Sequence, residues 1–423
     1  MKPPIFKQRN PPQNKRHRPA HLGMAYRKLQ ADALFDGSTL HHNKVLVTTA
    51  NGTIIDVVEA GASGTHNDDV EHHSGWLCPG FVNAHCHTEL SHMQGSIPAG
   101  TGMVPFLQQV VLGRAAPQQA IQHSMALAVA AMYKNGIQAV GDVCNTNNGF
   151  AIKAASPLHF HHFFEVSGFV PATAHQRLQP LLQLQQQWAQ QHGGPSSVVP
   201  HAPYSVSQPL LQLLAQLGPA ISTIHHMESA AEMAFMAHKT GPMLGLFEAL
   251  GIPLHFFEPL EQGVAGWLKP YFESTPQLVL VHNCHTSEEH VEFLQALNQQ
   301  SVQGASAGAR FYWCLCPNAN LYIGNPLPNV PLLAASGLPI CVGTDSLASN
   351  QQLCILFELQ TLQAQYAHLS TTQLLQWATL TGAMALGLQQ QLGSFAPGKK
   401  PGILLLQGLN ALTLQQGRVQ RLA

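Results

Sequence analysis

Apolar segments of strand length alternate with longer helical stretches eight times between Cys78 and Leu388. Regular alternation of strand and helix predicts a parallel sheet, and eight such units predict a closed (β/α)8 barrel. We therefore expect an α/β fold whose barrel spans residues 78–387. The predicted strands are 81–84, 139–143, 159–166, 197–200, 221–225, 278–282, 311–315 and 340–344. The predicted helices between them include 117–135, 209–217, 229–249, 287–298 and 371–386.

The segments on either side of this alternation have the pattern of short strands. Residues 45–48 and 53–58 are separated by Asn51-Gly52, a pair that is typical of a tight β-hairpin. Short strands are predicted again near the end of the chain. We expect residues 24–77 and 388–423 to combine into one small β-sandwich domain beside the barrel.

The first 23 residues differ from the rest of the chain in their charge. They contain six of the 20 lysines and arginines, no acidic residue and no hydrophobic periodicity. We expect residues 1–23 to form a disordered basic leader, although a basic segment can also contact a nucleic acid or a membrane. The remaining chain is slightly acidic, and no apolar run approaches the roughly 20 residues of a membrane-spanning helix. Neither a nucleic-acid partner nor a membrane is therefore expected.

The eight cysteines are scattered along the chain and form no C-x-x-C pair. This spacing is typical of reduced, buried thiols and not of a disulfide framework, so we predict a cytoplasmic protein. Its assembly into a homodimer stays open at this stage.

Polar residues suited to chemistry stand at the carboxyl ends of the predicted strands. His85 and His87 end the first strand, and because alternate strand residues face the same side, both imidazoles can enter one space. Two imidazoles on a rigid strand provide half of a transition-metal site. Other polar residues end or follow the later strands, among them His201, His225, His282 and Asp345. The carboxyl ends of barrel strands share one face, so we expect a single site there.

Five segments resemble known motifs and occur in a characteristic order: PGFVNAHCH, HAPYSVS, HHMESAAE, VLVHNC and VGTDS. They are similar to motifs of the amidohydrolase superfamily, in its cytosine-deaminase-like or chlorohydrolase-like branch. The resemblance covers the chain from about Leu29 to its end. It implies one metal ion between two strand-one histidines, a strand-five histidine and a strand-eight aspartate, which are here His85, His87, His225 and Asp345.

The sequence also bears on which histidine is the ligand and on how many metal ions the implied site holds. His226 adjoins His225, but the family spacing H-x-x-E, which ends on Glu228, favours His225 as the ligand. Several relatives hold two metals with a carboxylated lysine on the fourth strand, and no lysine occurs between Lys153 and Lys239. A mononuclear site is therefore expected. Zinc and iron both accept imidazole and carboxylate ligands, and zinc is favoured.

The resemblance also suggests catalytic and substrate-binding roles. Asp345 is expected to accept a proton from a metal-activated water, Glu228 to transfer protons as general acid and base, and His282 to polarise the group under attack. His201 and Glu89 are expected to bind substrate, with a purely supporting role equally open for Glu89. Structural or surface roles are favoured for three other residues, Asp142, Glu165 and Arg114, and for Glu232 a capping or solvent role stays open.

These roles suit hydrolytic deamination of an aminated heterocycle with release of ammonia. The corresponding group of the family includes deaminases of adenosine, S-adenosylhomocysteine, guanine and aminodeoxyfutalosine. One alternative is a related hydrolase that opens a cyclic amide or acts on a halogenated triazine. Another alternative is a catalytically inactive metal-binding protein. In the favoured interpretation the partner is a small-molecule substrate.

Overall fold

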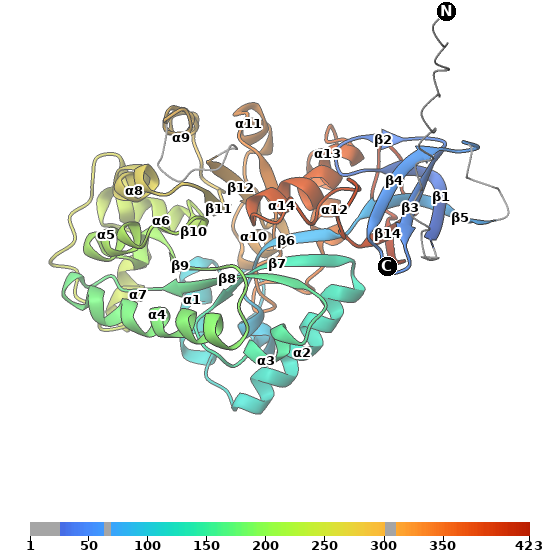
Figure 1. The fold of residues 1–423 in the computed structure, drawn as a ribbon. Helices are drawn as coiled ribbons and strands as arrows, with labels where there is room; N and C mark the ends of the chain where they lie inside the picture. The colour runs from blue at the N-terminus through green and yellow to red at the C-terminus, as the bar shows by residue number, and fades with distance from the viewer. Residues whose placement is uncertain (1–25, 63–68, 301–309) are drawn as a thin grey trace, which may run out of the picture.

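The structure, a computed structural model, describes residues 26–62, 69–300 and 310–423. It consists of a helix-rich body and a smaller β region to which both ends of the described chain contribute (Figure 1). The leader predicted to be disordered, residues 1–23, lies outside the described residues.

Seven strands from both ends of the chain form the β region. They are β1 (Tyr26–Phe35), β2 (Leu40–His41), β3 (Lys44–Thr49), β4 (Ile54–Glu59), β5 (Val70–Pro79), β14 (Ile403–Gln407) and β15 (Arg418–Arg421). Their order is β15-β14-β5-β1-β3-β4, with β2 paired to β1, and their apolar side chains form a separate hydrophobic cluster. The strands from the two chain ends meet in this sheet, because β5 is hydrogen-bonded on both edges, to β1 and to β14.

Eight further strands lie in the body and confirm all eight predicted strands to within a few residues. They are β6 (Phe81–Cys86), β7 (Ile137–Cys144), β8 (His159–Val166), β9 (Ser196–Pro200), β10 (Ser222–His226), β11 (Leu278–His282), β12 (Phe311–Leu315) and β13 (Ile340–Val342). They form two four-stranded parallel sheets, β6-β7-β8-β9 and β10-β11-β12-β13. Most of these strands are buried along their whole length, as expected for parallel strands covered on both faces.

Main-chain hydrogen bonds connect the two parallel sheets near the carboxyl ends of their strands. The amide of His225 in β10 donates to the carbonyl of His201 after β9, at 2.9 Å. The amides of Thr344 and Asp345, after β13, each donate to the carbonyl of His85 in β6 at 3.1 Å. The strand ends of both sheets therefore surround one common space.

Helices cover the outside of these sheets (Figure 1). They are α1 (Met103–Gly113), α2 (Gln118–Lys134), α3 (Phe150–Ala154), α4 (Ala174–Gln191), α5 (Gln208–Leu217), α6 (Ala230–His238), α7 (Met243–Ala249), α8 (Gly263–Ser274), α9 (Glu288–Asn298), α10 (Pro317–Ile323), α11 (Val330–Ala335), α12 (Ile355–Gln365), α13 (Thr371–Gln376) and α14 (Gly382–Ala385). Short 3-10 helices occur at Thr88–Met93, Pro171–Thr173 and Pro203–Ser205, and a π-helical turn occurs at Trp377–Thr381.

Two helices that the sequence predicts as continuous are interrupted. The predicted helix 229–249 divides into α6 and α7 because Lys239 and Gly241 adopt left-handed conformations, with φ of 52° and 87°. The predicted helix 371–386 is divided between α13 and α14 by the π-helical turn.

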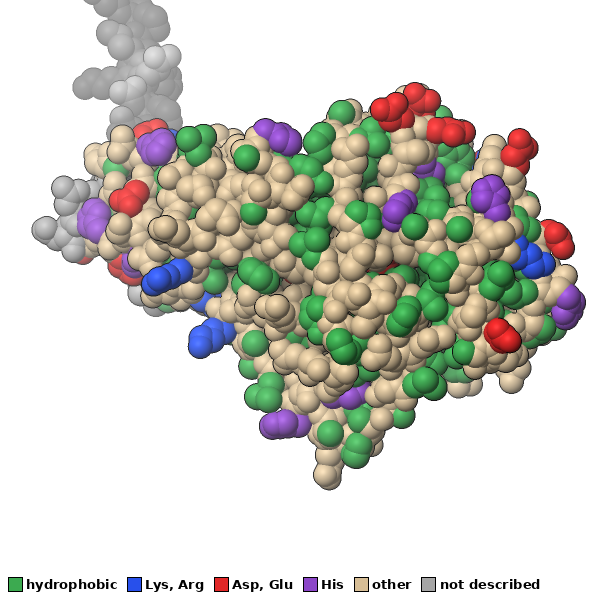
Figure 2. Space-filling model, turned by 180° about the vertical axis from the view of Figure 1, so that it is seen from behind, with side chains coloured by type: hydrophobic (Ala, Val, Ile, Leu, Met, Phe, Trp, Pro, Cys, Tyr) green, Lys and Arg blue, Asp and Glu red, His purple; other side chains and the backbone are tan. Residues whose placement is uncertain are grey.

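The surface of the body carries few charges. On the face seen in Figure 2, Lys, Arg, Asp and Glu side chains are few, and hydrophobic and uncharged groups cover most of the surface. Among the helices of residues 26–62, 69–300 and 310–423, none has the length and apolar character that crossing a bilayer requires.

Candidate metal and active site

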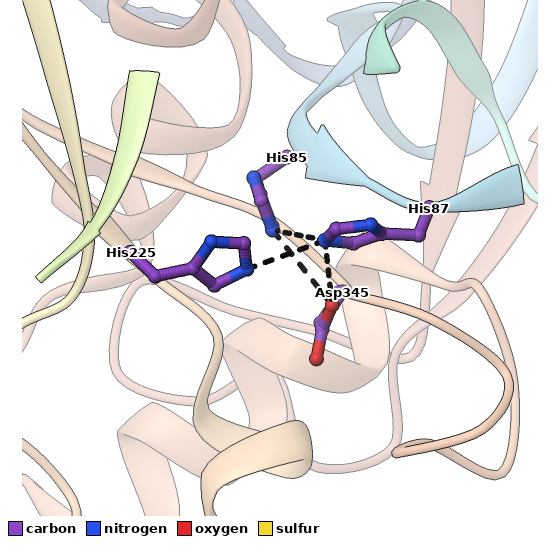
Figure 3. A group of neighbouring side chains, drawn as sticks. All are labelled: His85, His87, His225 and Asp345. Carbon is purple, nitrogen blue, oxygen red and sulfur yellow. Dashed lines mark hydrogen bonds and ion pairs between the residues drawn. The ribbon is translucent and has the colours of Figure 1, made fainter. Parts of the chain in front are cut away.

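Three histidines and one aspartate direct their side chains toward one point between the strand ends (Figure 3). His85 lies in β6, His87 directly follows this strand, His225 lies in β10, and Asp345 follows β13. Nε2 of His87 is 3.1 Å from Nε2 of His85 and 3.3 Å from Nε2 of His225. Oδ1 of Asp345 is 3.7 Å from Nε2 of His85 and 3.5 Å from Nε2 of His87.

These spacings fit the ligands of a tetrahedral zinc ion. Zinc–nitrogen distances of about 2.0–2.1 Å place two ligand atoms of a tetrahedron about 3.3 Å apart. Burial and the charge of His85 lower the pKa of His87 to about 3, so its ring is neutral and offers a lone pair. Nδ1 of His225 donates to the carbonyl of His201 at 2.9 Å, which directs the lone pair on Nε2 toward the same point. Converging lone pairs repel one another unless a cation lies between them.

The carboxylate of Asp345 is fixed by its own contacts. The Ser349 hydroxyl donates to Oδ2 at 2.6 Å, which leaves Oδ1 facing the histidines. Burial disfavours the charge of Asp345, but the neighbouring imidazoles of His85 and His87 hold its pKa well below the usual value. An anionic oxygen therefore joins three imidazole nitrogens, which is a suitable donor set for a divalent cation.

His226 has different partners from its neighbour His225. Its Nδ1 lies 2.9 Å from Oδ1 of Asn283, and its Nε2 lies 2.9 Å from Nε2 of His290. Both ring nitrogens are thus engaged in a separate buried network. The structure brings His225, and not His226, into the group of four.

Glu228 lies beside this group, buried and close to two other acids. Its Oε1 is 3.6 Å from Nε2 of His282, and its main-chain amide donates to Oε2 of Glu232 at 2.8 Å. Burial, together with the charges of Asp345 and Glu232, raises the pKa of Glu228 well above its usual value. The raised pKa favours the protonated form of Glu228, which can donate a proton.

Glu232 belongs to the start of α6. Its amide donates to the Ser229 hydroxyl at 3.1 Å while its carboxylate accepts from the amide of Glu228, so it satisfies free main-chain groups at the helix terminus. The sequence leaves Glu232 open between a functional role and a capping or solvent role, and these contacts favour capping of a buried helix start.

His282 is oriented by an amide side chain. Its Nδ1 lies 2.8 Å from Oδ1 of Asn320, which leaves Nε2 facing Glu228 as a hydrogen-bond acceptor. Burial lowers the pKa of His282 to about 4, so the ring is neutral. The main chain here is strained, with φ of 75° at His282 and 61° at Asn283.

Two adjoining cavities lie at these strand ends. The inner cavity, of about 60 Å³, is lined by the side chains of His87, His225, Glu228, His282 and Asp345 together with apolar residues. The outer cavity, of about 460 Å³, shares Leu107 and Tyr204 with the inner one. Its wall is mainly apolar and includes Phe169 and Phe247, so a substituent larger than the reacting ring can be accommodated there.

His201 and Arg114 line the outer cavity. Nδ1 of His201 lies 2.7 Å from the Ser205 hydroxyl, which leaves Nε2 available to a ligand. Arg114 donates to Oδ1 of Asn145 at 3.1 Å and borders the cavity, although the sequence favours a surface role for it.

Glu165 lies at the site, although the sequence favours a structural role for it. Its Oε1 lies 3.5 Å from Nδ1 of His225. Burial raises the pKa of Glu165 to about 8, against an opposing effect of the Arg114 charge. The signal that could have identified it is its position at the end of the third predicted strand, the same position that the other site residues occupy.

Glu89 and Asp142 lie behind the ligands. Both carboxylate oxygens of Glu89 accept hydrogen bonds from main-chain amides of the loop after β7. Asp142, in β7, is completely buried and accepts a hydrogen bond from the Thr88 hydroxyl. These contacts favour the supporting role that stays open for Glu89 in the sequence.

Parallel strands with a His-His-His-Asp group at their carboxyl ends define a metal-dependent enzyme of the α/β class. The sequence model of the Amidohydrolase family matches residues 76–420, and the chain belongs to this family. The predicted resemblance is thereby confirmed.

Known proteins similar to this chain agree with the family assignment. An aminodeoxyfutalosine deaminase from a Nitratiruptor species is 25% identical over 90% of this chain and 91% of its own length. The crystal structure of Helicobacter pylori aminofutalosine deaminase in complex with methylthio-coformycin has a TM-score of 0.72 and 21% identity, covering 92% of this chain and 94% of that one. An adenosine deaminase structure from Xanthomonas campestris with bound zinc has a TM-score of 0.67 and 18% identity, covering 92% and 90%.

Proposed function

We propose that the protein is a mononuclear metal-dependent hydrolase that deaminates an aminated heterocycle, of purine or nucleoside type, and releases ammonia. The observation that carries the proposal is the buried Glu228, whose pKa is raised, beside four ligand atoms spaced as for one zinc ion. The deaminase names of the similar proteins support the same reaction.

One divalent ion held by His85, His87, His225 and Asp345 completes the proposed site, and zinc is favoured. Such an ion, when bound, lowers the pKa of a water molecule to about 7 and so supplies a nucleophile at neutral pH. The zinc in the adenosine deaminase of similar fold supports this choice of metal.

The neighbouring side chains divide the proton transfers. Asp345, the anionic member of the ligand group, accepts a proton from the attacking water. Glu228, whose pKa is raised, donates its proton to a ring nitrogen of the substrate as the attacked carbon becomes tetrahedral. The proton held by Asp345 then passes to the departing amine, and the hydroxyl on the attacked carbon returns a proton to Glu228 as the carbonyl forms. His282, a neutral acceptor at Nε2, orients the water or the amine by a hydrogen bond.

The substrate extends from the inner cavity into the outer one. The heterocycle reaches the residues around Glu228, and its substituent lies against the apolar wall near Tyr204. His201 contacts the substrate through its free Nε2, and Arg114 contacts the distal end of the substituent. In this proposal Glu89 acts through the loops and not through a substrate contact.

Two broader expectations belong to the same proposal. The two parallel sheets, joined by the main-chain hydrogen bonds of His225, Thr344 and Asp345, close into one eight-stranded barrel. The eight cysteines are all free thiols, which supports a reducing compartment such as the cytoplasm.

The test is an ammonia assay on purified protein supplied with one equivalent of zinc. Adenosine, S-adenosylhomocysteine, aminodeoxyfutalosine, guanine and an aminotriazine form the substrate panel, with Glu228→Gln as the inactive control. Ammonia from at least one purine or nucleoside substrate is expected, with close to one metal per chain by elemental analysis. Ring-opened products or chloride without any ammonia would support the cyclic-amide or triazine alternative instead.

A further inference from the structure

The turn after His87 and the loop after β7 are held together by two acids that act in opposite directions. Asp142, on β7, accepts from the Thr88 hydroxyl at 2.6 Å and from the Thr88 amide at 3.3 Å. Glu89, in the turn, accepts at 3.0 Å from the amides of Asn145 and Thr146 and at 2.9 Å from the Thr146 hydroxyl. Each segment therefore supplies the carboxylate that satisfies the other segment's donors.

The charge of Asp142 is balanced by a lysine inside the protein. Nζ of Lys153, on α3, lies 2.5 Å from Oδ2 of Asp142, and both side chains are completely buried. Nδ1 of His162 lies 3.5 Å from the same oxygen. Burial disfavours the charge, but Lys153 and the hydrogen bond of His162 hold the pKa of Asp142 well below its usual value. The acceptor for Thr88 is thus an ion, whose hydrogen bonds are stronger than those of a neutral group.

Burying the charges of Asp142 and Lys153 costs free energy, which apolar side chains at the same place would avoid. A buried ion pair contributes little net stability compared with apolar side chains of similar volume. Its benefit lies in direction, since Asp142 is engaged on one oxygen by Thr88 and on the other by Lys153. The residue directly before Thr88 is His87, whose Nε2 must be placed within a few tenths of an ångström to ligate a metal.

We propose that Thr88, Asp142 and Glu89 are positioning residues that hold His87 in its ligand geometry, with Lys153 balancing the charge of Asp142. The inference rests on the metal site of the proposed function and goes beyond it by assigning a role to a buried ionic cluster outside that site. The β7 loop held by Glu89 also carries Asn145, whose side chain donates to the carbonyl of Glu165 at 2.7 Å and extends the connection to β8.

The test compares three substitutions in the full chain. Thr88→Val removes the hydroxyl at nearly constant volume, and Thr88→Ser retains it. Thr275→Val is the matched control, because Thr275 is equally buried and its hydroxyl donates to the carbonyl of Tyr271 at 2.8 Å, at the end of α8. The zinc dissociation constant by chelator competition and the melting temperature of the metal-free protein are measured for each variant.

Thr88→Val is expected to weaken zinc binding by about tenfold or more, within the range usual for residues that orient metal ligands. Thr88→Ser should bind zinc as the wild type does, and Thr275→Val should lower the melting temperature without changing zinc affinity. Equal zinc affinity in Thr88→Val and the wild type would overturn the positioning role. A wild type that binds no zinc would overturn the metal site itself, whereas weakened zinc binding in Thr88→Val without ammonia release from the wild type would support the positioning role and reject the deaminase.

Discussion

The ends of the two parallel sheets build the site in different ways. Among non-glycine residues of the described chain, six have positive φ, and four of these lie at the ends of the sheet β10–β13: Met227, His282, Asn283 and Asp345. The site residues of the sheet β6–β9, including His85 and His87, have none. The first sheet thus presents ligands from ordinary strand ends, while the second bends its main chain to place the proton-transfer groups.

The site thus has a first half at the ends of the sheet β6–β9 and a second half at the ends of the sheet β10–β13. These two halves are also stabilised by different chemistry. A buried ion pair between Asp142 and Lys153 supports the first half. Neutral amide and hydroxyl side chains, namely Asn283, Asn320 and Ser349, support the second half. Strained main chain is characteristic of functional sites, because the surrounding structure must enforce it. In this molecule the strain coincides with His282 and Asp345, which have proposed roles in the reaction, and with Met227, which precedes Glu228.

The largest effect is expected from Asp345→Asn, which removes an anionic ligand and a proton acceptor at a strained position of the second half. Since loss of a general base alone costs roughly 10²–10⁴-fold, kcat/KM should fall by about 10⁴-fold or more. Elemental analysis should also show reduced metal content. Ser349→Ala, which removes only the hydrogen bond to Oδ2, serves as the milder control. Full activity in Asp345→Asn would exclude the aspartate from the reaction.

Glu228→Gln is expected to separate chemistry from metal binding. The amide is isosteric but cannot transfer a proton, so kcat should fall by about 10²–10⁴-fold. Zinc content should stay at the wild-type level, because Glu228 is not one of the four ligand groups. Its carboxylate lies instead beside His282, at 3.6 Å. Loss of zinc in this variant would mean that the ligand and proton-transfer roles are wrongly divided.

Lys153→Met tests the ionic support of the first half. Removing one partner of a buried pair leaves an uncompensated charge and should cost about 3–5 kcal/mol of unfolding free energy. The double variant Asp142→Asn/Lys153→Met should recover part of this loss. Lys44→Met is the control, because Lys44 pairs with the exposed Glu59 and surface pairs contribute about 0–1 kcal/mol. The free energy of unfolding is measured by denaturant titration. Equal losses of this free energy in Lys153→Met and Lys44→Met would contradict the difference between the buried and the exposed ion pair.

The sequence predicts the strands well because they depend on a local pattern of apolar residues. The four-residue ligand group follows from the resemblance to the amidohydrolase motifs, and its side chains lie together in the structure. Apolar strands ending in a histidine or aspartate are visible without three-dimensional contacts. The break between α6 and α7 is not, because it depends on left-handed conformations at Lys239 and Gly241. The places of Glu165 and Arg114 escape the sequence for a related reason, since their proximity to His225 and the outer cavity follows only from folding.

The polar start of β5 is another feature that the local sequence pattern does not predict. Residues around His72 and His73 are too polar to suggest a strand from the sequence. They pair with β1, which supplies the hydrogen bonds that make an extended conformation favourable. Tertiary pairing overrides local propensity at this edge of the sheet.

His225→Asn and His226→Asn sharpen the comparison within β10. His225→Asn should remove metal and activity together, because its Nε2 belongs to the group of four. His226→Asn should retain one metal per chain and lower stability by about 1–3 kcal/mol, since Oδ1 of Asn283 and Nε2 of His290 lose their buried imidazole partner. Metal analysis of both proteins after gel filtration checks the assignment. The reverse pattern would make His226 the ligand.

The smallest expected effect concerns pH. Glu358 supports the loop after β13 by accepting from Asn350 and from the amide of Asn318, and burial raises its pKa to about 8 from a usual 4.5. A carboxyl whose pKa is higher in the folded state stabilises the fold fully below pH 4.5, and this contribution is lost as pH rises toward 8.

Asp142 has the opposite sign, because its pKa is lowered in the folded state and its contribution is lost only as pH falls into the acid range. Buried histidines with lowered pKa values, such as His87 and His282, add the same pH dependence to the wild type and its variants, so the comparison is between slopes. From about pH 5 to about pH 8 the melting temperature of the metal-free wild type should fall relative to that of Glu358→Gln, by on the order of a few degrees. Asp142→Asn should keep the slope of the wild type across the same pH range. Equal slopes of melting temperature against pH in the wild type and Glu358→Gln would mean that Glu358 is already ionised in the folded protein. The second half of the site would then contain a buried charge, as the first half does.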